Sequence, residues 1–499
     1  MSHYEEEDEE LQEHEAKDWE LVRGTNLELR AEALLCISRR TSQDLTKQVE
    51  ALTFAESAID ILRKLGDTKK LAAALWAKAD PLYALNRWAE ARDASIEAAE
   101  LSAELLDDSR AGTMFYNAGG CAYNLREYQE SYELFTKAKE YHQAASEPID
   151  TGRSVAWAGK NLYELGNFEG AITAYQEAID LFEPEGSLGK LADACRLLGK
   201  AYIRAGKLDL AAKALERSEA CLEFCPNAET ESKLKFARGL YLAAKGDHVR
   251  AIAVFQELYE AAKAAVLPEH STANAFERAK SEMAIGEYES AAKTFRQISL
   301  AVKGTRSDIT SLDAMLQLVK AYELAEYDVD HEAALNEVLA MPELQEKSEL
   351  KNKLTLSLGL LLTKQPDGTR GLKVLEALPR SVFEVGGVSW MEHGMALLEN
   401  YRRAGRNSEC LFLANEILGI ADHSYFAVLI AELHAIKTDV LQTMGQQAQA
   451  QAEAKIAFEA FSNVNLLNKA MFIKEKFLVV TPTSAEPNYL LNSSELKDA

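Results

Sequence analysis

Residues 151–184, TGRSVAWAGKNLYELGNFEGAITAYQEAIDLFEP, predict one helix–turn–helix unit. A first helix is expected to run to about Leu165, because Gly166 then breaks it. A second helix is expected to begin near Phe168 and to stop at Pro184, which cannot continue a helix. This unit recurs every forty residues through most of the chain.

Three kinds of residue recur at forty-residue intervals on either side of this stretch. The turn residue recurs as Asn86, Arg126, Gly166, Gly206, Gly246 and Gly286. The small residue seven positions earlier recurs as Ala79, Gly119, Gly159, Gly199, Gly239 and Ala279. The small residue five positions after the turn recurs as Ala91, Ser131, Ala171, Ala211, Ala251 and Ala291. Six consecutive units in one register indicate a stacked array of repeats.

The small residues predict a close approach between the two helices of a unit. Glycine inside a helix costs about 1 kcal/mol relative to alanine, so its recurrence indicates that a neighbouring helix leaves no room for a larger side chain. The small residue of the second helix is expected to lie opposite it. Large residues fill the space around this contact, and one such column is Phe135, Tyr175, Leu215, Phe255 and Phe295.

The segment LGNFEGAITAYQEAIDLFEP, residues 165–184, resembles the tetratricopeptide repeat family in its glycine, aromatic, alanine and closing proline positions. The resemblance covers roughly residues 71–298 and again 401–457. It implies an all-α fold, a right-handed superhelical solenoid of about ten or eleven helix pairs. Units of forty residues are longer than is usual in the family, so the second helix or the link to the next unit is expected to be extended. Similar long units occur in vesicle-fusion adaptors, kinesin light chains and bacterial peptide-sensing regulators.

Composition predicts two tails around two repeat blocks. Residues 1–20 form an acidic segment expected to be a flexible tail, and residues 481–499, rich in Pro, Ser and Asn, are expected to be another. The repeats are expected to form an N-terminal block, residues 21–380, and a C-terminal block, residues 381–480. The stretch RSVFEVGG, residues 380–387, marks the expected break.

The overall charge excludes several classes of partner. A formal net charge of −24 argues against nucleic acid and against an anionic membrane. No run of 18 or more apolar residues is present and the N-terminus is acidic, so we expect a cytoplasmic protein without membrane insertion. The six cysteines are scattered, and we expect buried thiols rather than a metal site. We also expect no cofactor and no enzymatic activity, since zinc-hydrolase, phosphate-loop and GxSxG signatures are absent.

Other recurring residues lie on the face of the first helix that points away from the second helix. In the family that face lines the concave groove, so these residues are the predicted binding site. Tyrosine offers a large surface with a polar tip, and arginine a bidentate fork for carboxylates. The predicted partner-binding residues are Trp76, Tyr83, Tyr116, Tyr123, Arg153, Lys160, Tyr163, Arg196, Lys200, Arg204, Phe236 and Lys280. The alternative is that the tyrosines only pack between neighbouring first helices.

The sequence therefore favours a non-enzymatic interaction scaffold that holds a protein or peptide segment, carrying acidic residues, in the groove. One alternative is a regulator switched by a peptide, as in bacterial sensors of this family. Another is a self-associating assembly component, since the final stretch NKAMFIKEKFLVV is rather apolar. A further hypothesis is that the acidic residues 5–20 fold back over Lys160, Arg196 and Lys200 and mask them.

Overall fold

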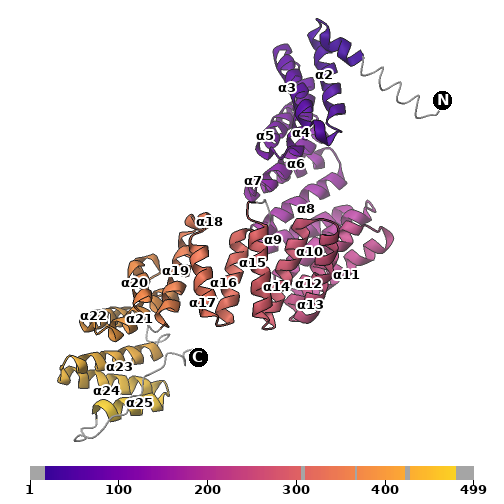
Figure 1. Ribbon diagram of the computed structural model, residues 1–499. Coiled ribbons are helices and arrows are strands. Elements are labelled where there is room, and N and C mark those ends of the chain that lie inside the picture. The colour runs from indigo at the N-terminus through magenta and orange to yellow at the C-terminus, as the bar shows by residue number, and fades with distance from the viewer. Residues whose placement is uncertain (1–16, 305–308, 366–367, 422–426, 479–499) are drawn as a thin grey trace. The chain divides into compact units, whose positions relative to one another are not determined.

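The computed structural model describes residues 17–304, 309–365, 368–421 and 427–478. Within these ranges the regular structure is helical and contains no β-strand (Figure 1). The chain divides into two compact units, Met1–Glu287 (unit 1) and Tyr288–Ala499 (unit 2). In each unit, helices that follow one another in sequence pack side by side. This arrangement is an all-α helical solenoid, which confirms the predicted fold class.

Unit 1 has a regular period of twenty residues per helix and connector. Its elements are α2 (Leu27–Thr41), η1 (Leu45–Lys47), α3 (Gln48–Leu65), α4 (Thr68–Ala84), α5 (Trp88–Glu104), α6 (Asp108–Asn124), α7 (Tyr128–Ala144), α8 (Pro148–Glu164), α9 (Phe168–Phe182), α10 (Leu188–Arg204), α11 (Leu208–Phe224), α12 (Ala228–Ala244), α13 (His248–Ala264) and α14 (Pro268–Ala284). Apart from α9 with 15 residues, every helix from α4 to α14 has 17. First and second helices are thus about equally long, so the length of the forty-residue unit is shared between its two helices.

The connectors turn through residues with a left-handed backbone. In the predicted turn column Gly166 has φ 79°, and the non-glycine residues Asn86 and Arg126 have φ 58° and 65°. After α8, the Gly166 amide donates to Tyr163 O and the Asn167 amide to Leu162 O, which satisfies carbonyls at the helix end. The connectors between pairs use the same geometry at Leu106, Ser146, Gly186 and Val266, a column that the sequence analysis did not identify.

Unit 2 is less regular. Its elements are α15 (Tyr288–Ala301), α16 (Ser311–Leu324), α17 (Asp328–Leu339), α18 (Pro342–Gln345), α19 (Ser348–Thr363), α20 (Thr369–Ala377), η2 (Arg380–Val382), α21 (Val388–Arg403), α22 (Asn407–Ile420), α23 (Ala427–Thr443), α24 (Gln447–Asn463), α25 (Leu467–Ile473) and η3 (Lys474–Leu478). Taking the described helices in chain order from α2 to α24, without the short α18, gives eleven pairs. The predicted number was ten or eleven.

Recurring glycines allow the helices of a pair to touch. A Cβ atom on Gly119 would lie 3.0 Å from the Phe135 ring, and one on Gly239 would lie 2.6 Å from the Phe255 ring. The predicted close approach is confirmed, but the nearest atoms belong to the large side chain sixteen residues later. The small residue of the second helix approaches the backbone instead, since the Ser131 hydroxyl donates to Gly119 O at 2.8 Å.

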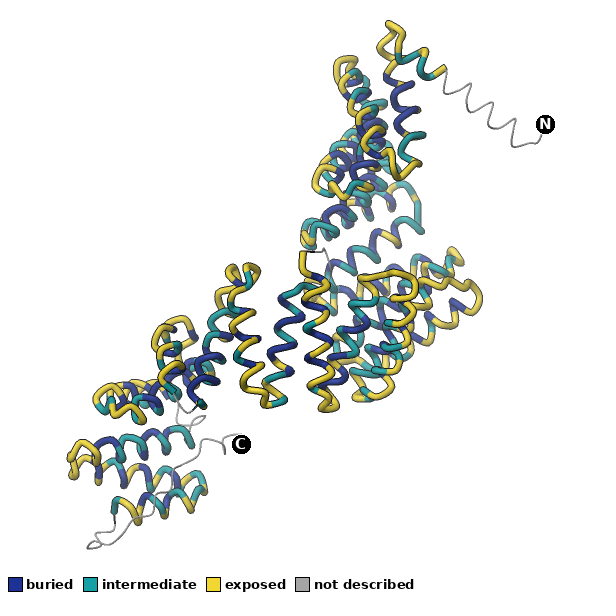
Figure 2. Tube along the Cα trace, in the orientation of Figure 1, coloured by how far each residue is buried: buried dark blue, intermediate teal, exposed yellow. Residues whose placement is uncertain are grey.

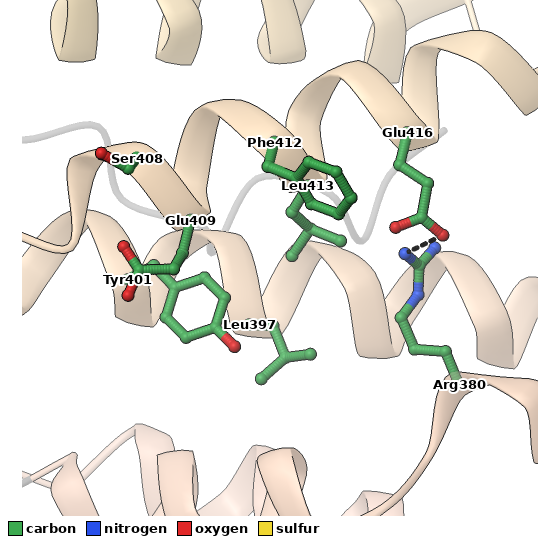
Figure 3. A pocket seen from close by; sticks show the side chains of 8 residues that line it. All are labelled: Arg380, Leu397, Tyr401, Ser408, Glu409, Phe412, Leu413 and Glu416. Atoms are coloured by element: carbon green, nitrogen blue, oxygen red, sulfur yellow. Dashed lines mark ion pairs between the residues drawn. The ribbon is translucent and has the colours of Figure 1, made fainter.

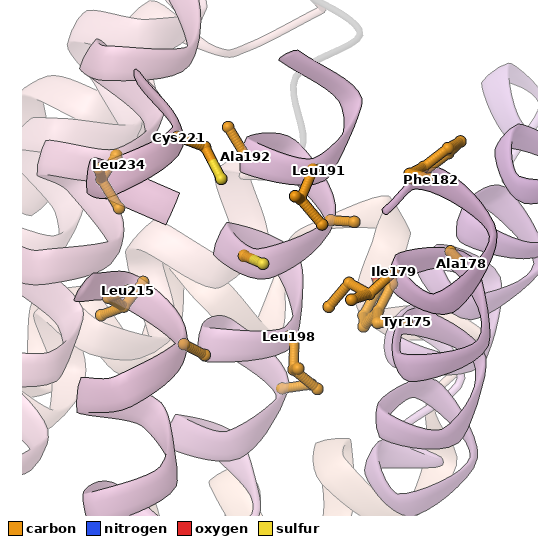
Figure 4. Packing of buried hydrophobic residues seen from close by; sticks show 14 of the residues in the cluster. Tyr175, Ala178, Ile179, Phe182, Leu191, Ala192, Leu198, Leu215, Cys221 and Leu234 are labelled. Carbon is orange, nitrogen blue, oxygen red and sulfur yellow. The ribbon is translucent and has the colours of Figure 1, made fainter. Parts of the chain in front are cut away.

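Buried side chains join successive pairs into a continuous core. One cluster combines Tyr175 and Ile179 of α9, Leu198 of α10, Leu215 of α11 and Leu234 of α12 (Figure 4). Exposed residues gather at the connectors between helices (Figure 2). Each pair therefore depends on its neighbours for part of its buried surface, as expected of a repeat array.

Two observations bear on the expected boundaries, and most of the expected tails cannot be compared. The predicted break at residues 380–381 is not the division between the compact units, and one buried cluster holds both Leu375 and Trp390. Residues 1–16 and 481–499, which carry most of the predicted tails, lie outside the described residues. Residues 17–23 are helical, and Trp19 lies edge-on to Phe54 at 5.6 Å.

Two further expectations concern cysteines and membranes. Cys36 and Cys225 are exposed, although buried thiols were expected, and the other four cysteines are buried. Burial raises the pKa of the Cys121 and Cys195 thiols to about 12.

Among the described helices, none has the length and apolar character needed to cross a bilayer.

Candidate functional site

The predicted binding residues lie on the first helices of unit 1, α4, α6, α8, α10, α12 and α14. We call the side that carries them the inner face. Two neighbouring residues of α6 represent its two sides. Gly119 is covered by Phe135, whereas a Cβ atom on Gly120 would meet nothing within 4 Å. The inner face is therefore the side of the first helices that their second helices leave uncovered.

Three contacts of one kind connect consecutive first helices. The Arg153 guanidinium lies 4.6 Å from the centre of the Tyr116 ring, Lys160 Nζ lies 4.2 Å from the Tyr123 ring and Lys200 Nζ lies 5.2 Å from the Tyr163 ring. Each cation follows its ring by 37 residues, and we call the three contacts the cation–aromatic ladder. Such contacts contribute roughly 0.5–2 kcal/mol each. Six predicted residues are thus brought together in pairs.

Lys160 occupies a cage of two rings. Its Nζ atom is also 4.2 Å from the Trp157 ring, and Trp157 meets Tyr123 edge-on at 5.3 Å. The other side of Trp157 stacks on Phe135 at 5.5 Å, so this residue joins the inner face to the core. Sequence reasoning missed Trp157, because the residues forty positions away are Asn117 and Leu197 and no aromatic column exists there.

Lys200 differs from its neighbours in having no counter-ion. Its side chain is half-buried, and no described residue forms an ion pair or hydrogen bond with its ammonium group. Burial lowers the pKa of Lys200 to about 8, assisted by the positive charges of Arg196 and Lys160, while Glu164 and Asp193 oppose the shift. Lys200 is therefore mostly protonated at pH 7, and no described carboxylate pairs directly with it.

Three other predicted cations are paired with a carboxylate three residues earlier on their own helix. Arg196 is buried and donates from Nε and Nη2 to Asp193 Oδ1, at 3.0 and 2.6 Å. Arg153 Nη1 donates to Asp150 Oδ1 at 2.7 Å. Lys280 Nζ lies 3.0 Å from both carboxylate oxygens of Glu277. These pairs reduce the positive charge that a partner would meet.

Tyr83 shows what happens when one position of the ladder is missing. The residue 37 positions after Tyr83 is Gly120, which has no side chain to cover the ring. Tyr83 is accordingly 47% exposed, although its ring meets Trp88 edge-on at 4.5 Å. The α4–α6 end of the inner face therefore presents an open aromatic surface.

The remaining predicted residues contribute mainly to packing. Trp76 is half-buried against the core cluster of the first pairs, and Phe236 lies edge-on to Phe255 at 5.6 Å. The Arg204 guanidinium lies 5.0 Å from the centre of the Phe168 ring. The structure therefore gives these side chains a role in holding helices together.

Charged residues on several first helices affect Tyr163. Burial raises the pKa of the Tyr163 hydroxyl, with Glu164 and Glu277 adding to the shift and Arg204 opposing it. Glu277 is on α14, three helix pairs after the α8 that carries Tyr163. Glu277 therefore adds to the shift from a different first helix.

Comparison with known proteins agrees with this architecture. Residues 158–229 match the tetratricopeptide repeat family model, and this match includes Lys160, Arg196 and Lys200. No curated protein sequence matches the chain. The structure resembles a signal-transduction ATPase with numerous domains and a tetratricopeptide repeat sensor from Pyrococcus horikoshii, at 10% identity and a TM-score of 0.54, covering 80% of this chain and 57% of that protein.

Two further solved structures are similar at lower scores. Aspartyl phosphate phosphatase F from Bacillus subtilis has 18% identity and a TM-score of 0.48, covering 58% of this chain and 76% of that one. The human IFIT1 dimer with m7Gppp-AAAA has 15% identity and a TM-score of 0.45, covering 91% and 95%. At these scores neither likeness bears on function. Residues 158–229 thus match the tetratricopeptide repeat model, and the stacked helix pairs on either side of them share the fold of the sensor protein.

Proposed function

We propose that this protein is a non-enzymatic scaffold that holds an acidic protein or peptide segment on the inner face of unit 1. The observation that carries the proposal is Lys200, a half-buried cation with which no described carboxylate forms an ion pair, close to Arg196 and Lys160 on a face that also carries tyrosine rings. An anionic side chain of a partner would supply the missing negative charge. The rings would contact its apolar parts at little cost in conformational entropy.

The negative net charge of the whole chain does not prevent such binding. At physiological ionic strength, charges separated by more than about 8 Å are largely screened. A bound segment would therefore respond to the cations that it touches. Acidic residues elsewhere would instead slow the approach of an acidic partner, so the proposal predicts a modest association rate that rises with salt.

The test is a charge reversal of the inner face. The variant carries Lys160→Glu, Arg196→Glu and Lys200→Glu, and its helicity and melting temperature are compared first with those of the native chain. The control carries Lys213→Glu, Lys245→Glu and Lys263→Glu, which makes the same change in net charge at exposed positions of unit 1. Both are used in affinity capture with a mass-spectrometric readout.

We expect a partner that is retained by the native chain and by the control, but lost from the folded inner-face variant. Retention by all three proteins would place binding elsewhere and overturn the proposal. Light scattering on the same samples addresses self-association, since a chain of 55.2 kDa that assembles with itself would give a multiple of that mass.

A further inference from the structure

A pocket of about 400 Å³ opens in unit 2 between α21 and α22 (Figure 3). This size is in the range of sites that accept a large side chain or a small ligand. The pocket has an apolar middle and a charged group at each end. Its lining residues are Arg380, Leu397, Tyr401, Ser408, Glu409, Phe412, Leu413 and Glu416.

Arg380, despite lining the pocket, offers little charge to a ligand. Its guanidinium lies 3.6 Å from the centre of the Trp390 ring, and its Nη1 atom is 2.9 Å from Glu416 Oε1. The Nε, Nη1 and Nη2 atoms are buried, and none of them has the geometry of a hydrogen bond to a described residue. The contact with Glu416 is therefore an ion pair without a hydrogen bond. The Glu416 side chain is 40% exposed and that of Arg380 only 13%. A ligand at this end therefore meets the carboxylate.

The opposite end of the pocket also presents a carboxylate. Glu409 accepts a hydrogen bond from Arg406 Nε at 3.0 Å, and its side chain remains 49% exposed. Its own backbone amide and Arg406 hold the pKa of Glu409 below its usual range, so it is ionised at neutral pH. Arg406 is in turn held over the Tyr401 ring, at 4.4 Å from its centre. Arg406 also pairs with Glu376, so its single positive charge is shared between two carboxylates and Glu409 can accept a second cation.

The middle of the pocket is apolar. Leu397 and Leu413 are buried and form its floor, whereas Phe412 is 73% exposed at its rim. A spacing of three or four residues along α22 places four side chains on one face of that helix, those of Glu409, Phe412, Leu413 and Glu416. An apolar strip between two carboxylates is thus presented on a single helix face.

We propose that this pocket binds a basic amphipathic segment of a partner protein, with a large apolar side chain beside Phe412 and a Lys or Arg at each end, near Glu409 and Glu416. The site is in unit 2 and takes a ligand of opposite charge to that proposed for the inner face. The net charge of −24 also favours the approach of a cationic partner. The two proposals can therefore stand or fall separately.

The experiment uses three acetylated and amidated peptides of equal length with the full-length protein. The first repeats Lys-Leu-Leu-Lys, the second replaces Lys by Glu, and the third replaces Leu by Ser. Binding is followed by fluorescence anisotropy at two salt concentrations. We expect the first peptide to bind at least about tenfold more tightly than either of the others. Equal binding of the Lys-Ser peptide would show attraction by net charge alone and would overturn the proposal.

Matched variants locate the site. Phe412→Ala is expected to weaken the Lys-Leu peptide about tenfold, because a central aromatic contact is lost. The control is Phe224→Ala, which truncates another exposed phenylalanine, 78% exposed, in unit 1. Glu409→Gln is expected to weaken binding several-fold and to reduce its dependence on salt. If Phe412→Ala and Phe224→Ala bind the peptide as the native chain does, the pocket is not the binding site.

Discussion

Gly119 and Gly120 are neighbours on α6, yet they belong to two regions with opposite requirements. A Cβ atom on Gly119 would meet the Phe135 ring, whereas one on Gly120 would meet nothing within 4 Å. On the packed side of the first helices, volume decides which residue is tolerated. On the inner face, the residue is instead determined by charge and by ring contacts between successive first helices. The contacts of Lys160 and Lys200 with tyrosine rings are examples.

The comparison shows that recurrence has more than one cause. The glycine column is required by packing within a pair. The tyrosine and lysine columns hold neighbouring pairs together and also leave Tyr83 and Lys200 available. Recurrence on an uncovered face is therefore not by itself evidence of contact with a ligand. Mutations that distinguish the two sides test this view.

The largest effect is expected on the packed side. In Gly239→Ala the new methyl group would lie 2.6 Å from a ring carbon of Phe255, which is fully buried and cannot move away easily. We expect a loss of about 1–3 kcal/mol in the free energy of unfolding. The measurement is the thermal or urea midpoint by circular dichroism. An unchanged midpoint would show that the pair is less tightly packed than these distances indicate.

An intermediate effect of opposite sign is expected at Lys200. The folded chain holds the pKa of Lys200 near 8, below 10.5, so the unfolded chain binds more protons between these values. Lys200→Met should stabilise the protein at pH 7 by on the order of 2 kcal/mol. The advantage should shrink as pH rises from about 8 to 10.5, since the native lysine becomes neutral. A difference that is constant across this range would contradict the proton linkage.

A smaller gain is expected at Gly120. Gly120→Ala adds a methyl group in open space and removes the conformational cost of glycine inside a helix. The free energy of unfolding should rise by up to about 1 kcal/mol. Paired with Gly239→Ala, the same substitution thus has opposite signs on the two sides. If Gly120→Ala also destabilises, the inner face of α6 is more crowded at Gly120 than the open space around this residue indicates.

The smallest effect is expected at Tyr83. Its hydroxyl accepts only a long hydrogen bond, 3.4 Å from Asn124 Nδ2, on an exposed surface. Tyr83→Phe should therefore change the free energy of unfolding by less than about 0.5 kcal/mol. Any loss of partner binding in this variant would then come from the hydroxyl and not from the fold. A large shift in the melting midpoint would show that this weak contact matters structurally.

Much of the fold could be predicted because its repeats are local. Periodicity placed the end of α8 within one residue and both ends of α9 within two residues of those observed, and it placed the left-handed turn at Gly166. The division after Glu287 could not be found in this way, since no break in composition accompanies it. The Phe412 pocket also escaped prediction, because its charged ends come from η2 and α22 and depend on packing in three dimensions.

The sequence by itself determined the repeat, its turns and the residues that face the second helix, because each depends on backbone preferences or side-chain volume within one pair. The tertiary structure decided which charges remain available. Arg196 and Lys280, like Lys200, are cations that the sequence places on the inner face of a first helix. Each of the two is nevertheless paired with a carboxylate on its own helix. Whether a cation is compensated depends on distances of a few ångströms between side chains, and a forty-residue period does not contain that information.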